Sequence, residues 1–202
     1  MTDFLNKDYW NNRYINQQIN WDLGLISPPI KAYIDQINNK NFRILIPGAG
    51  NGYEAIYLLE LGFTNVTVVD FAEKPLFDLA QKLKTHHPQN YHLIQDDFFN
   101  LIGQYDLILE QTFFCALHLS LRENYVKQIH NLLNVEGKLV GLLFNKQFAF
   151  DGPPFSGTTE EYQSLFQDNF QINKMEDAYN SVKPRIGSEL FINFTKRGNV
   201  NC

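Results

Sequence analysis

The segment 42–70 constrains the fold of this chain most strongly, because it reads strand, glycine-rich turn, helix and strand in direct succession. Residues 43–46, an arginine followed by three apolar residues, form a run that is too short for a helix, so they predict a buried strand of a parallel sheet. Residues 47–52 break this strand, and residues 53–61 return to apolar positions at helical spacing. The β-branched run 66–69 then predicts a second strand. A strand–turn–helix–strand unit points backbone N–H groups and a helix N-terminus at a bound ligand.

The turn contains three glycines, Gly48, Gly50 and Gly52, and their spacing bears on the ligand. The dinucleotide fingerprint is G-x-G-x-x-G, whereas this turn reads G-x-G-x-G and runs into the bulky Tyr53. This variant resembles motif I of class I S-adenosylmethionine (SAM) methyltransferases. It therefore favours SAM over a dinucleotide, and a structural turn without any ligand is the third alternative.

Asp70 and Phe71 end the second predicted strand. In nucleotide-binding units of this kind, an acid roughly 20 residues beyond the turn binds the ribose hydroxyls. Asp70 lies near this spacing from the last glycine, which predicts a ribose contact. The alternative is that Asp70 only caps the helix that follows.

The composition limits the classes of protein to which this chain can belong. Its 202 residues, 44% of them hydrophobic, suit one α/β domain over residues 1–202. The net charge is −5 and no run of Lys and Arg exceeds two residues, so the sequence predicts no nucleic-acid partner. The polar N-terminus and the lack of a long apolar run predict a cytoplasmic protein without a signal peptide or membrane span. Cys115 and Cys202 form neither a disulfide framework nor a metal-ligand spacing, and a monomer is compatible with this composition.

Strands and helices continue to alternate after residue 71. Further strands are expected at 91–94, 105–110, 138–144, 170–175 and 189–195, and helices at 74–84, 121–133 and 159–166. The sequence thus predicts a seven-stranded, mostly parallel sheet that ends in an antiparallel hairpin, with helices on both faces. This is the Rossmann-like α/β fold of class I SAM methyltransferases.

Several short motifs follow one another along the chain. They are Trp10-x3-Tyr14-x6-Trp21-Asp22-x-Gly24, Ile46-Pro47-Gly48-Ala49-Gly50-Asn51-Gly52, Thr112-Phe113-Phe114-Cys115-Ala116-Leu117, Gly152-Pro153-Pro154-Phe155 and Pro184-Arg185-x-Gly187-x-Glu189. Together they resemble the thiopurine S-methyltransferase superfamily, closest to its halide/thiol methyltransferase branch, from about Trp10 to Lys196. The resemblance implies a SAM-dependent methyltransferase that acts on a small soft nucleophile, a thiol, sulfide or halide, and releases S-adenosylhomocysteine (SAH).

The resemblance also implies which residues hold the cofactor. Residues 1–40 would form a helical lid that places the rings of Trp10, Tyr14 and Trp21 over SAM, and a cation over an aromatic face gains roughly 0.5–2 kcal/mol. The family usually has Trp where this chain has Tyr14. The other expected cofactor residues are Gly48 and Gly50 for the methionine part, Gly52 of the same turn, Asp70 with Phe71 for the ribose, Asp96 or Asp97 with Phe98 for the adenine, and Glu110. Glu110-Gln111 stands where the family commonly has Asp-Tyr, so one hydrogen-bonding hydroxyl is missing here.

No catalytic residue can be assigned from the sequence, because an anionic soft nucleophile needs no general base. The candidates on the acceptor side are His118, Arg185, which could attract an anion, and Phe155, an aromatic wall where the family usually has Tyr. Their structural alternatives are a helix cap for His118 and a surface ion pair with Glu189 for Arg185. Two alternatives to the leading function stay open: an O- or N-methyltransferase of a small metabolite, which needs a general base, and a SAM-binding protein without turnover.

Overall fold

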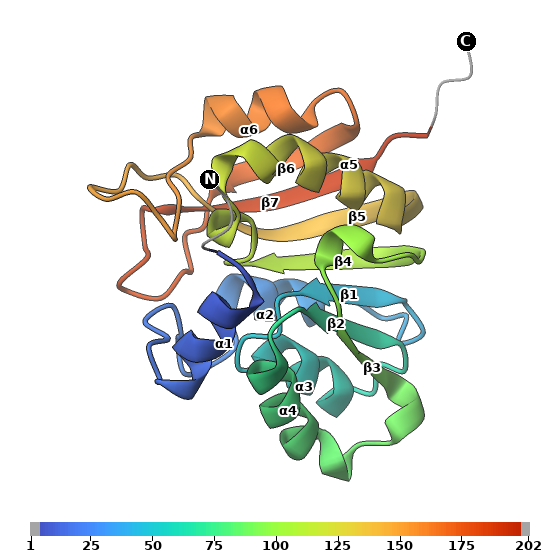
Figure 1. Cartoon of the computed structure of the whole chain (residues 1–202). Coiled ribbons are helices and arrows are strands. Elements are labelled where there is room, and N and C mark those ends of the chain that lie inside the picture. Colours follow the sequence, from blue (N-terminus) through green and yellow to red (C-terminus); the bar gives the residue numbers. More distant parts are fainter. Residues whose placement is uncertain (1–4, 199–202) are drawn as a thin grey trace.

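Seven strands form one sheet, in the order β3-β2-β1-β4-β5-β7-β6, in the computed structural model of this chain (Figure 1). They are β1 (Ile44–Pro47), β2 (Val66–Asp70), β3 (Tyr91–Gln95), β4 (Tyr105–Gln111), β5 (Leu133–Phe144), β6 (Phe170–Asp177) and β7 (Glu189–Lys196). The first five strands run parallel, and β7 pairs antiparallel with both β5 and β6. This confirms the predicted sheet. The structure describes residues 5–198, so Cys202 and residues 1–4 of the predicted domain lie outside the described residues.

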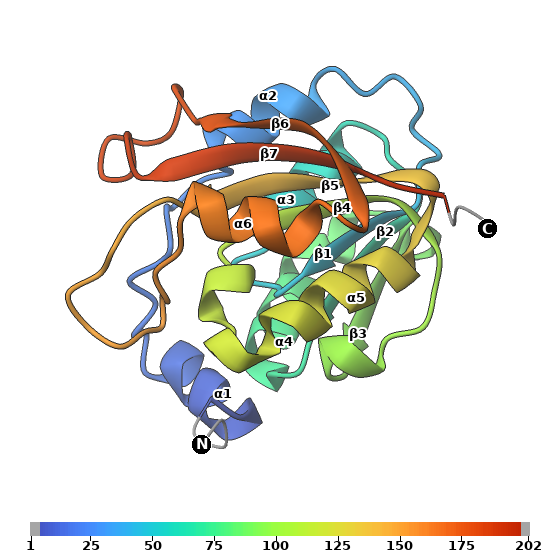
Figure 2. The same ribbon diagram turned by 90° about the horizontal axis from the view of Figure 1, so that it is seen from above.

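Helices lie on both faces of the sheet (Figure 2). They are α1 (Lys7–Ile15), α2 (Pro28–Ile34), α3 (Tyr53–Glu60), α4 (Glu73–Lys82), α5 (Arg122–Leu132) and α6 (Thr159–Phe166). One apolar cluster contains Ile30 of α2, Leu58 of α3 and Leu79 of α4, and the other contains Ile129 of α5 and Phe166 of α6. All five side chains are fully buried, so packing of an apolar face stabilises these short helices more than their intrinsic propensity does. None of the described helices is long and apolar enough to cross a lipid bilayer.

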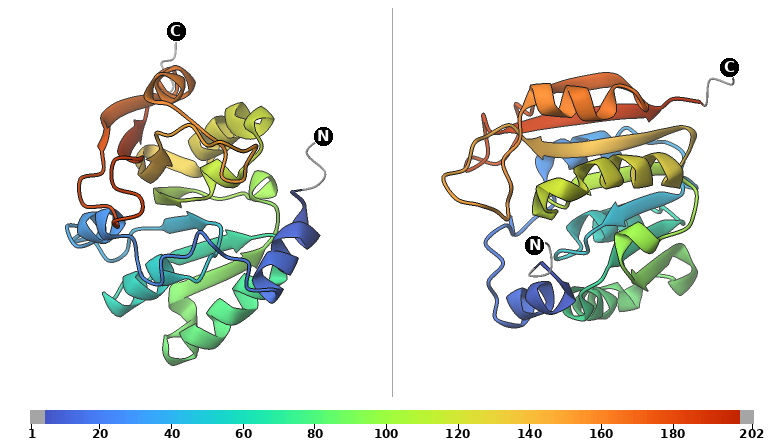
Figure 3. Two further views of the ribbon diagram at one scale, coloured as in Figure 1. Left: turned by 90° about the vertical axis from the view of Figure 1, so that its left-hand side faces the viewer. Right: turned by 45° about the horizontal axis from the view of Figure 1, so that its top comes forward.

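The strand order places the crevice of the sheet beside β1. Both β1 and β2 are buried along their whole length, as is usual for parallel strands covered on both faces. Because β1 pairs with β2 on one side and β4 on the other, the order of the strands reverses there. In open α/β sheets, ligands bind at the carboxyl ends of the strands at such a point. Helix α1, the loop 145–158 and the loop 178–188 gather at this end of the sheet, which faces the viewer in the left panel of Figure 3.

The predicted junction between the helix 121–133 and the strand 138–144 is wrong. Helix α5 ends at Leu132 and β5 begins at once, rather than at residue 138. Leu133 pairs with Tyr105 of β4, and the chain bulges before the regular ladder resumes at Lys138. A Cβ on Gly137 would lie 2.8 Å from the carbonyl oxygen of Asn134, so a glycine lets the strand pass through this bulge.

The predicted lid over residues 1–40 is too long. Ile30 and Ile34 of α2 are fully buried in the cluster that covers the central strands. Helix α2 therefore belongs to the core, because removing these two large apolar side chains from water stabilises its packed position. The described residues 5–21, which we call the N-terminal segment, remain as the candidate lid.

Candidate active site

A cavity of about 900 Å³ opens where the carboxyl ends of the central strands meet. The ends of β1, β2 and β3 line one half of it, and the ends of β4 and β5 with the loop before β7 line the other. We name these the β1–β3 half and the β4–β5 half. The acids among the described lining residues, Asp70, Asp96 and Asp97, all lie in the β1–β3 half, whereas Lys146 and Arg185 lie in the β4–β5 half.

Asp70 holds the glycine turn in place from the end of β2. Its Oδ2 accepts a hydrogen bond from the N–H of Ala49 (2.9 Å), and its Oδ1 accepts one from the N–H of Ala72 (2.8 Å), where α4 begins. Burial raises the pKa of Asp70 to about 6, although these hydrogen bonds act in the opposite direction. Asp70 and Phe71 both line the cavity. Because each carboxylate oxygen accepts more than one hydrogen bond, contact with the start of α4 leaves room for the expected ribose contact.

The three glycines of the turn have different surroundings. All adopt left-handed φ values, +78° at Gly48, +52° at Gly50 and +76° at Gly52. Gly48 and Gly50 line the cavity, and a Cβ on Gly50 would meet no atom within 4 Å. Gly52 lies outside the cavity wall, and a Cβ there would come within 2.3 Å of the Leu79 side chain in α4. Gly52 is therefore required by helix packing, contrary to its assignment to the cofactor.

The residues after β3 bring two carboxylates to the cavity. Asp96, Asp97 and Phe98 all line it. Oδ1 of Asp97 accepts a hydrogen bond from the N–H of Phe99 (2.9 Å), and Oδ1 of Asp96 accepts one from the N–H of Asp97 (2.7 Å). The Phe98 ring packs edge-on against Phe113, with 5.2 Å between ring centroids. The choice between the two acids as the adenine acceptor stays open, because both reach the cavity.

Three aromatic rings of the N-terminal segment face the same cavity. The Trp21 ring lies edge-on to Trp10 and Tyr14, with ring centroids 5.5 Å and 5.7 Å away. The guanidinium carbon of Arg13 lies 5.8 Å from the centroid of the Trp21 ring. Burial raises the pKa of Tyr14, which keeps its phenol neutral. The structure therefore brings together the three aromatic residues that the family resemblance assigned to the lid.

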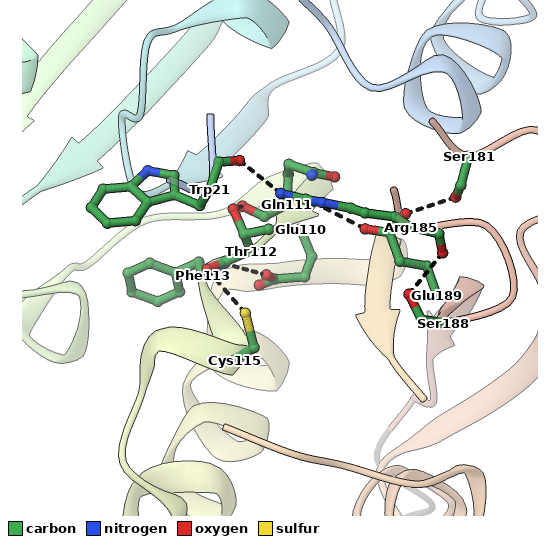
Figure 4. Close-up of polar contacts among 10 residues, drawn as sticks. All are labelled: Trp21, Glu110, Gln111, Thr112, Phe113, Cys115, Ser181, Arg185, Ser188 and Glu189. Atoms are coloured by element: carbon green, nitrogen blue, oxygen red, sulfur yellow. Dashed lines mark hydrogen bonds and ion pairs between the residues drawn. The ribbon is translucent and has the colours of Figure 1, made fainter. Parts of the chain in front are cut away.

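Glu110, near the end of β4, does not reach the cavity. It is fully buried, and its Oε1 accepts hydrogen bonds from the N–H groups of Phe113 (2.8 Å) and Phe114 (2.9 Å). Its Oε2 accepts one from the hydroxyl of Tyr125 (2.7 Å). Burial raises the pKa of Glu110 to about 7. Glu110 orders the turn after β4, as Figure 4 shows for Phe113, so its assignment as a cofactor-binding residue is corrected.

Gln111 lines the cavity, although its neighbour Glu110 does not. Successive side chains of a strand point to opposite faces of the sheet, so only one of the two can face the cavity. Oε1 of Gln111 is buried without a hydrogen-bond partner among the described residues, and so is Nε of Arg13. Thr112 follows with φ +60°, a left-handed conformation that is strained for a β-branched residue and is typical of functional sites. A buried polar atom without a partner costs about 1–3 kcal/mol, so Gln111 and Arg13 point to a ligand that supplies the missing partners.

The β4–β5 half of the cavity has aromatic walls that the sequence reasoning missed. Phe144 at the end of β5, with Phe148 and Phe150 in the following loop, lines it. Phe155, the residue expected in this wall, is 8% exposed and lines only a smaller neighbouring pocket. The signal that could have found the three rings is their position, since the loop after β5 begins at the ligand-binding end of the sheet.

The other two acceptor-side candidates line the cavity but are engaged in contacts. Nδ1 of His118 accepts a hydrogen bond from the N–H of Ser120 (3.3 Å), and the His118 ring packs edge-on against Phe155. Arg185 is 8% exposed, and its Nη1 donates to Oε1 of Glu189 (3.0 Å; Figure 4). The pairing of Arg185 with Glu189 is present, but it is buried and not on the surface.

These surroundings fit SAM. A Cβ on Gly50 would meet open space, and the cavity lining contains acids that can accept hydrogen bonds from ribose or adenine donors as well as aromatic rings whose faces attract a cation. Gln111, whose buried Oε1 has no partner among the described residues, lines the same cavity. Within residues 5–198, no group of three or more His, Cys, Asp or Glu side chains could hold a metal ion.

Comparisons with known proteins agree with this fit. The family model described as thiopurine S-methyltransferase matches residues 5–190 of the chain. Probable thiol methyltransferase 2 of Arabidopsis thaliana is 28% identical over 173 residues, which cover 84% of this chain and 76% of that protein. Thiopurine S-methyltransferase of Acinetobacter baylyi is 24% identical over 195 residues, covering 84% of this chain and 88% of that protein. Thiocyanate methyltransferase 1 of Brassica oleracea is 25% identical over 173 residues, covering 84% and 76%.

Solved structures share the fold at low sequence identity. The 1,6-didemethyltoxoflavin-N1-methyltransferase of Burkholderia thailandensis, solved with 1,6-didemethyltoxoflavin and SAH, has a TM-score of 0.80 and 19% identity. The match covers 97% of this chain and 89% of that chain. Magnesium protoporphyrin IX methyltransferase of Synechocystis, solved with SAM, has a TM-score of 0.74 and 15% identity over 94% of each chain. These likenesses confirm the predicted fold.

Proposed function

Since this chain belongs to the thiopurine S-methyltransferase family and is a SAM-dependent methyltransferase, we propose that it methylates a small soft nucleophile, a thiol, sulfide or halide, in the β4–β5 half of the cavity. Relatives named as thiol and thiocyanate methyltransferases support this acceptor class. When bound, SAM supplies a methyl group on a positively charged sulfur, which the nucleophile takes by in-line displacement, leaving SAH.

One observation carries the choice of acceptor. The described lining of the β4–β5 half consists largely of aromatic and aliphatic side chains with Lys146 and Arg185, and it contains no carboxylate. A thiolate, hydrosulfide or iodide enters such a half without a general base, because it is already an anion. Alignment of the reactants and exclusion of water can lower the barrier by roughly 7–11 kcal/mol in well-oriented systems. Walls such as Phe144 and Phe148 would exclude water from this half.

The β1–β3 half would hold the cofactor. We assign Asp70 to the ribose hydroxyls, the turn at Gly48 and Gly50 to the methionine part, and Asp96 or Asp97 to the adenine amino group. The rings of the N-terminal segment would cover the sulfonium. Their contacts with one another and their place in the cavity wall support this assignment.

The acceptor is proposed to be a small molecule and not a nucleic acid. The net charge of the chain is −5, whereas proteins that bind nucleic acid present a basic face to the phosphates. Among the described residues, the cavity wall holds four that are cationic, Lys7, Arg13, Lys146 and Arg185, and aromatic rings line the same hollow. Such a hollow suits a compact anion better than a polyphosphate backbone.

A second candidate function rests on His118. Its ring lines the cavity, so it could act as the general base of an O- or N-methyltransferase. In that case the pH profile of turnover would change shape in His118→Ala. For a soft nucleophile, the profile would instead follow the ionisation of the acceptor and keep its shape in His118→Ala.

The experiment that tests the proposal offers acceptors directly. Purified protein is mixed with SAM and hydrosulfide, an aromatic thiol or iodide, while SAH and the methylated product are measured. Turnover with any of the three supports the soft-nucleophile assignment, and their relative rates rank the acceptors. If the protein binds SAH but forms no product from any of the three acceptors, the soft-nucleophile assignment is contradicted. A larger metabolite as acceptor, or a SAM-binding protein without turnover, would then be favoured.

A further inference from the structure

Arg185 contacts the start of β7, the N-terminal segment and the end of β5, and Figure 4 shows its hydrogen bonds to Glu189 and to Trp21. Its Nη1 donates to Oε1 of Glu189 at the start of β7 (3.0 Å), and its Nη2 donates to the carbonyl oxygen of Trp21 in the N-terminal segment (2.7 Å). Its guanidinium carbon lies 5.5 Å from the ring centroid of Phe144 at the end of β5. A planar guanidinium presents its N–H donors in a fixed fork and a flat face that stacks on a ring, whereas a lysine ammonium offers three donors from one nitrogen and has no planar face.

Glu189, the residue that pairs with Arg185, is held firmly at the start of β7. Oε2 of Glu189 accepts a hydrogen bond from the hydroxyl of Ser181 (2.7 Å), and Glu189 and Ser181 are both buried. The backbone of Glu189 also accepts a hydrogen bond from Ala178 (2.9 Å), which ties the loop 178–188 to β7. The Glu189 carboxylate is thus held in place by Ser181 of the preceding loop. Arg185 bonds both to this fixed carboxylate and to the Trp21 carbonyl, so it restrains the position of that carbonyl.

The ion pair makes Arg185 a poor attractor for an anionic acceptor. Its positive charge lies next to the buried carboxylate of Glu189, so the field that the pair presents to the cavity is much weaker than that of a lone cation. Lys146, which lines the same half of the cavity, is exposed. The sequence-based idea that Arg185 attracts the nucleophile therefore gives way to a different role.

We infer that Arg185 is a positioning residue that latches the N-terminal segment over the cavity by holding the Trp21 backbone. The Trp21 ring contacts both Trp10 and Tyr14. Fixing the Trp21 backbone therefore fixes this cluster of three rings, which would cover the cofactor in the β1–β3 half. Arg185 itself lines the β4–β5 half, so the latch connects the wall of that half to the N-terminal segment. This inference concerns the same site as the proposed function. It relies on the proposed function only in taking SAM as the ligand that the aromatic rings cover.

The test uses Trp21 as its own reporter. The chain has two tryptophans, so Trp10→Phe leaves Trp21 as the single indole emitter, and all variants are made in this background. Arg185→Lys keeps the charge beside Glu189 but loses the two-acceptor fork. The double variant Arg185→Met with Glu189→Met removes both charges and leaves no unpaired buried carboxylate, which keeps the test valid if a single neutral replacement fails to fold. Lys183→Gln, an exposed cation in the same loop, is the matched control.

We expect acrylamide to quench Trp21 emission more strongly in both latch variants of the protein without ligand, and not in the Lys183→Gln control. Loss of one hydrogen bond from a charged donor should weaken SAH binding about 10-fold in the same variants. Unchanged Trp21 quenching and unchanged SAH affinity, with only the acceptor KM raised, would overturn the latch and return Arg185 to the acceptor. Quenching in the ligand-free protein needs no turnover, so it tests the latch even if the proposed acceptor class is wrong.

Discussion

The Asp70 carboxylate and the Ala49 N–H are hydrogen-bonded at 2.9 Å, so the acid that ends β2 holds the glycine turn that follows β1. The two segments also meet through the N–H of Gly48 and the carbonyl oxygen of Val69 (2.8 Å). A cofactor that uses both the turn and the acid would therefore meet a preformed site, whose geometry depends on one buried side chain.

Replacing Asp70 by Asn should weaken SAH binding. The amide keeps one oxygen for Ala49 or Ala72, but it loses the charge and one of the two acceptor atoms. Loss of hydrogen bonds to a charged group costs about 1.5–3 kcal/mol, which corresponds to an affinity lowered about 10- to 100-fold. Calorimetric titration with SAH measures the change, and thermal unfolding checks that the variant is folded. Undiminished affinity in a folded Asp70→Asn protein would contradict the ribose assignment.

The pH dependence of binding should report the same group. Burial raises the pKa of Asp70 to about 6, so the carboxylate becomes protonated as the pH falls below that value and no longer accepts freely from ribose hydroxyls. SAH affinity of the parent protein should therefore fall between pH 7 and pH 5, roughly a unit on each side of this pKa. In Asp70→Asn the affinity should change little over the same range. Parallel profiles for the two proteins would show that another group controls binding.

The sequence predicts which residues lie at strand ends better than it predicts where their side chains point. Periodicity and turn residues locate β1, β2 and Asp70, because buried parallel strands and glycine turns leave local signals. Glu110 and Gln111 are adjacent at the end of β4, and nothing local tells which of them faces the cavity. The sheet decides it, since Glu110 points to Tyr125 of α5 and Gln111 points to the opposite side.

Long-range packing explains the other differences from the prediction. Helix α2 is seven residues long, too short to fold alone, and forms because Ile30 and Ile34 are buried in the core. Phe155 and Phe148 belong to one loop and are alike in chemistry, yet only Phe148 lines the main cavity. Tertiary contacts place these side chains, and no pattern within a short window of sequence reports them.

Replacing Glu110 by Gln should change how stability depends on pH. The native pKa of Glu110 is raised to about 7, whereas its ordinary value is 4.5. Between these two values the native state binds more protons than the unfolded state, so this group lowers the free energy of unfolding as the pH rises from 4.5 to about 7. Glu110→Gln lacks that titration. Urea unfolding at several pH values should show the parent losing stability relative to the variant over this interval, with a constant difference above it; a difference that does not vary with pH would contradict the raised pKa.

Replacing Gln111 by Leu should weaken the binding of ligands that carry the amino-acid part of the cofactor. Gln111, whose buried Oε1 has no partner among the described residues, lines the cavity at the end of β4, and β4 pairs with β1, the strand that leads into the glycine turn. A cationic N–H donor at the turn would satisfy this Oε1, and losing that bond should weaken SAH binding about 10-fold. Binding of 5′-methylthioadenosine, which lacks the amino-acid part, should change little. Equal losses for both ligands would place the Gln111 contact elsewhere.

Alanine at Gly50 and at Gly52 should separate binding from packing. Both positions have left-handed φ values, which cost an L-residue about 1–2 kcal/mol. At Gly50 the new methyl group enters the open cavity, so the variant should stay folded while its SAH affinity falls. At Gly52 the Cβ would lie 2.3 Å from the Leu79 side chain, and overpacking adds about 1–3 kcal/mol of destabilisation. Urea unfolding should therefore show Gly52→Ala as the less stable variant, and titration with SAH should show Gly50→Ala as the weaker binder. The reverse order in the titration would return Gly52 to the cofactor site and remove Gly50 from it, and the reverse order in unfolding would contradict the packing role of Gly52.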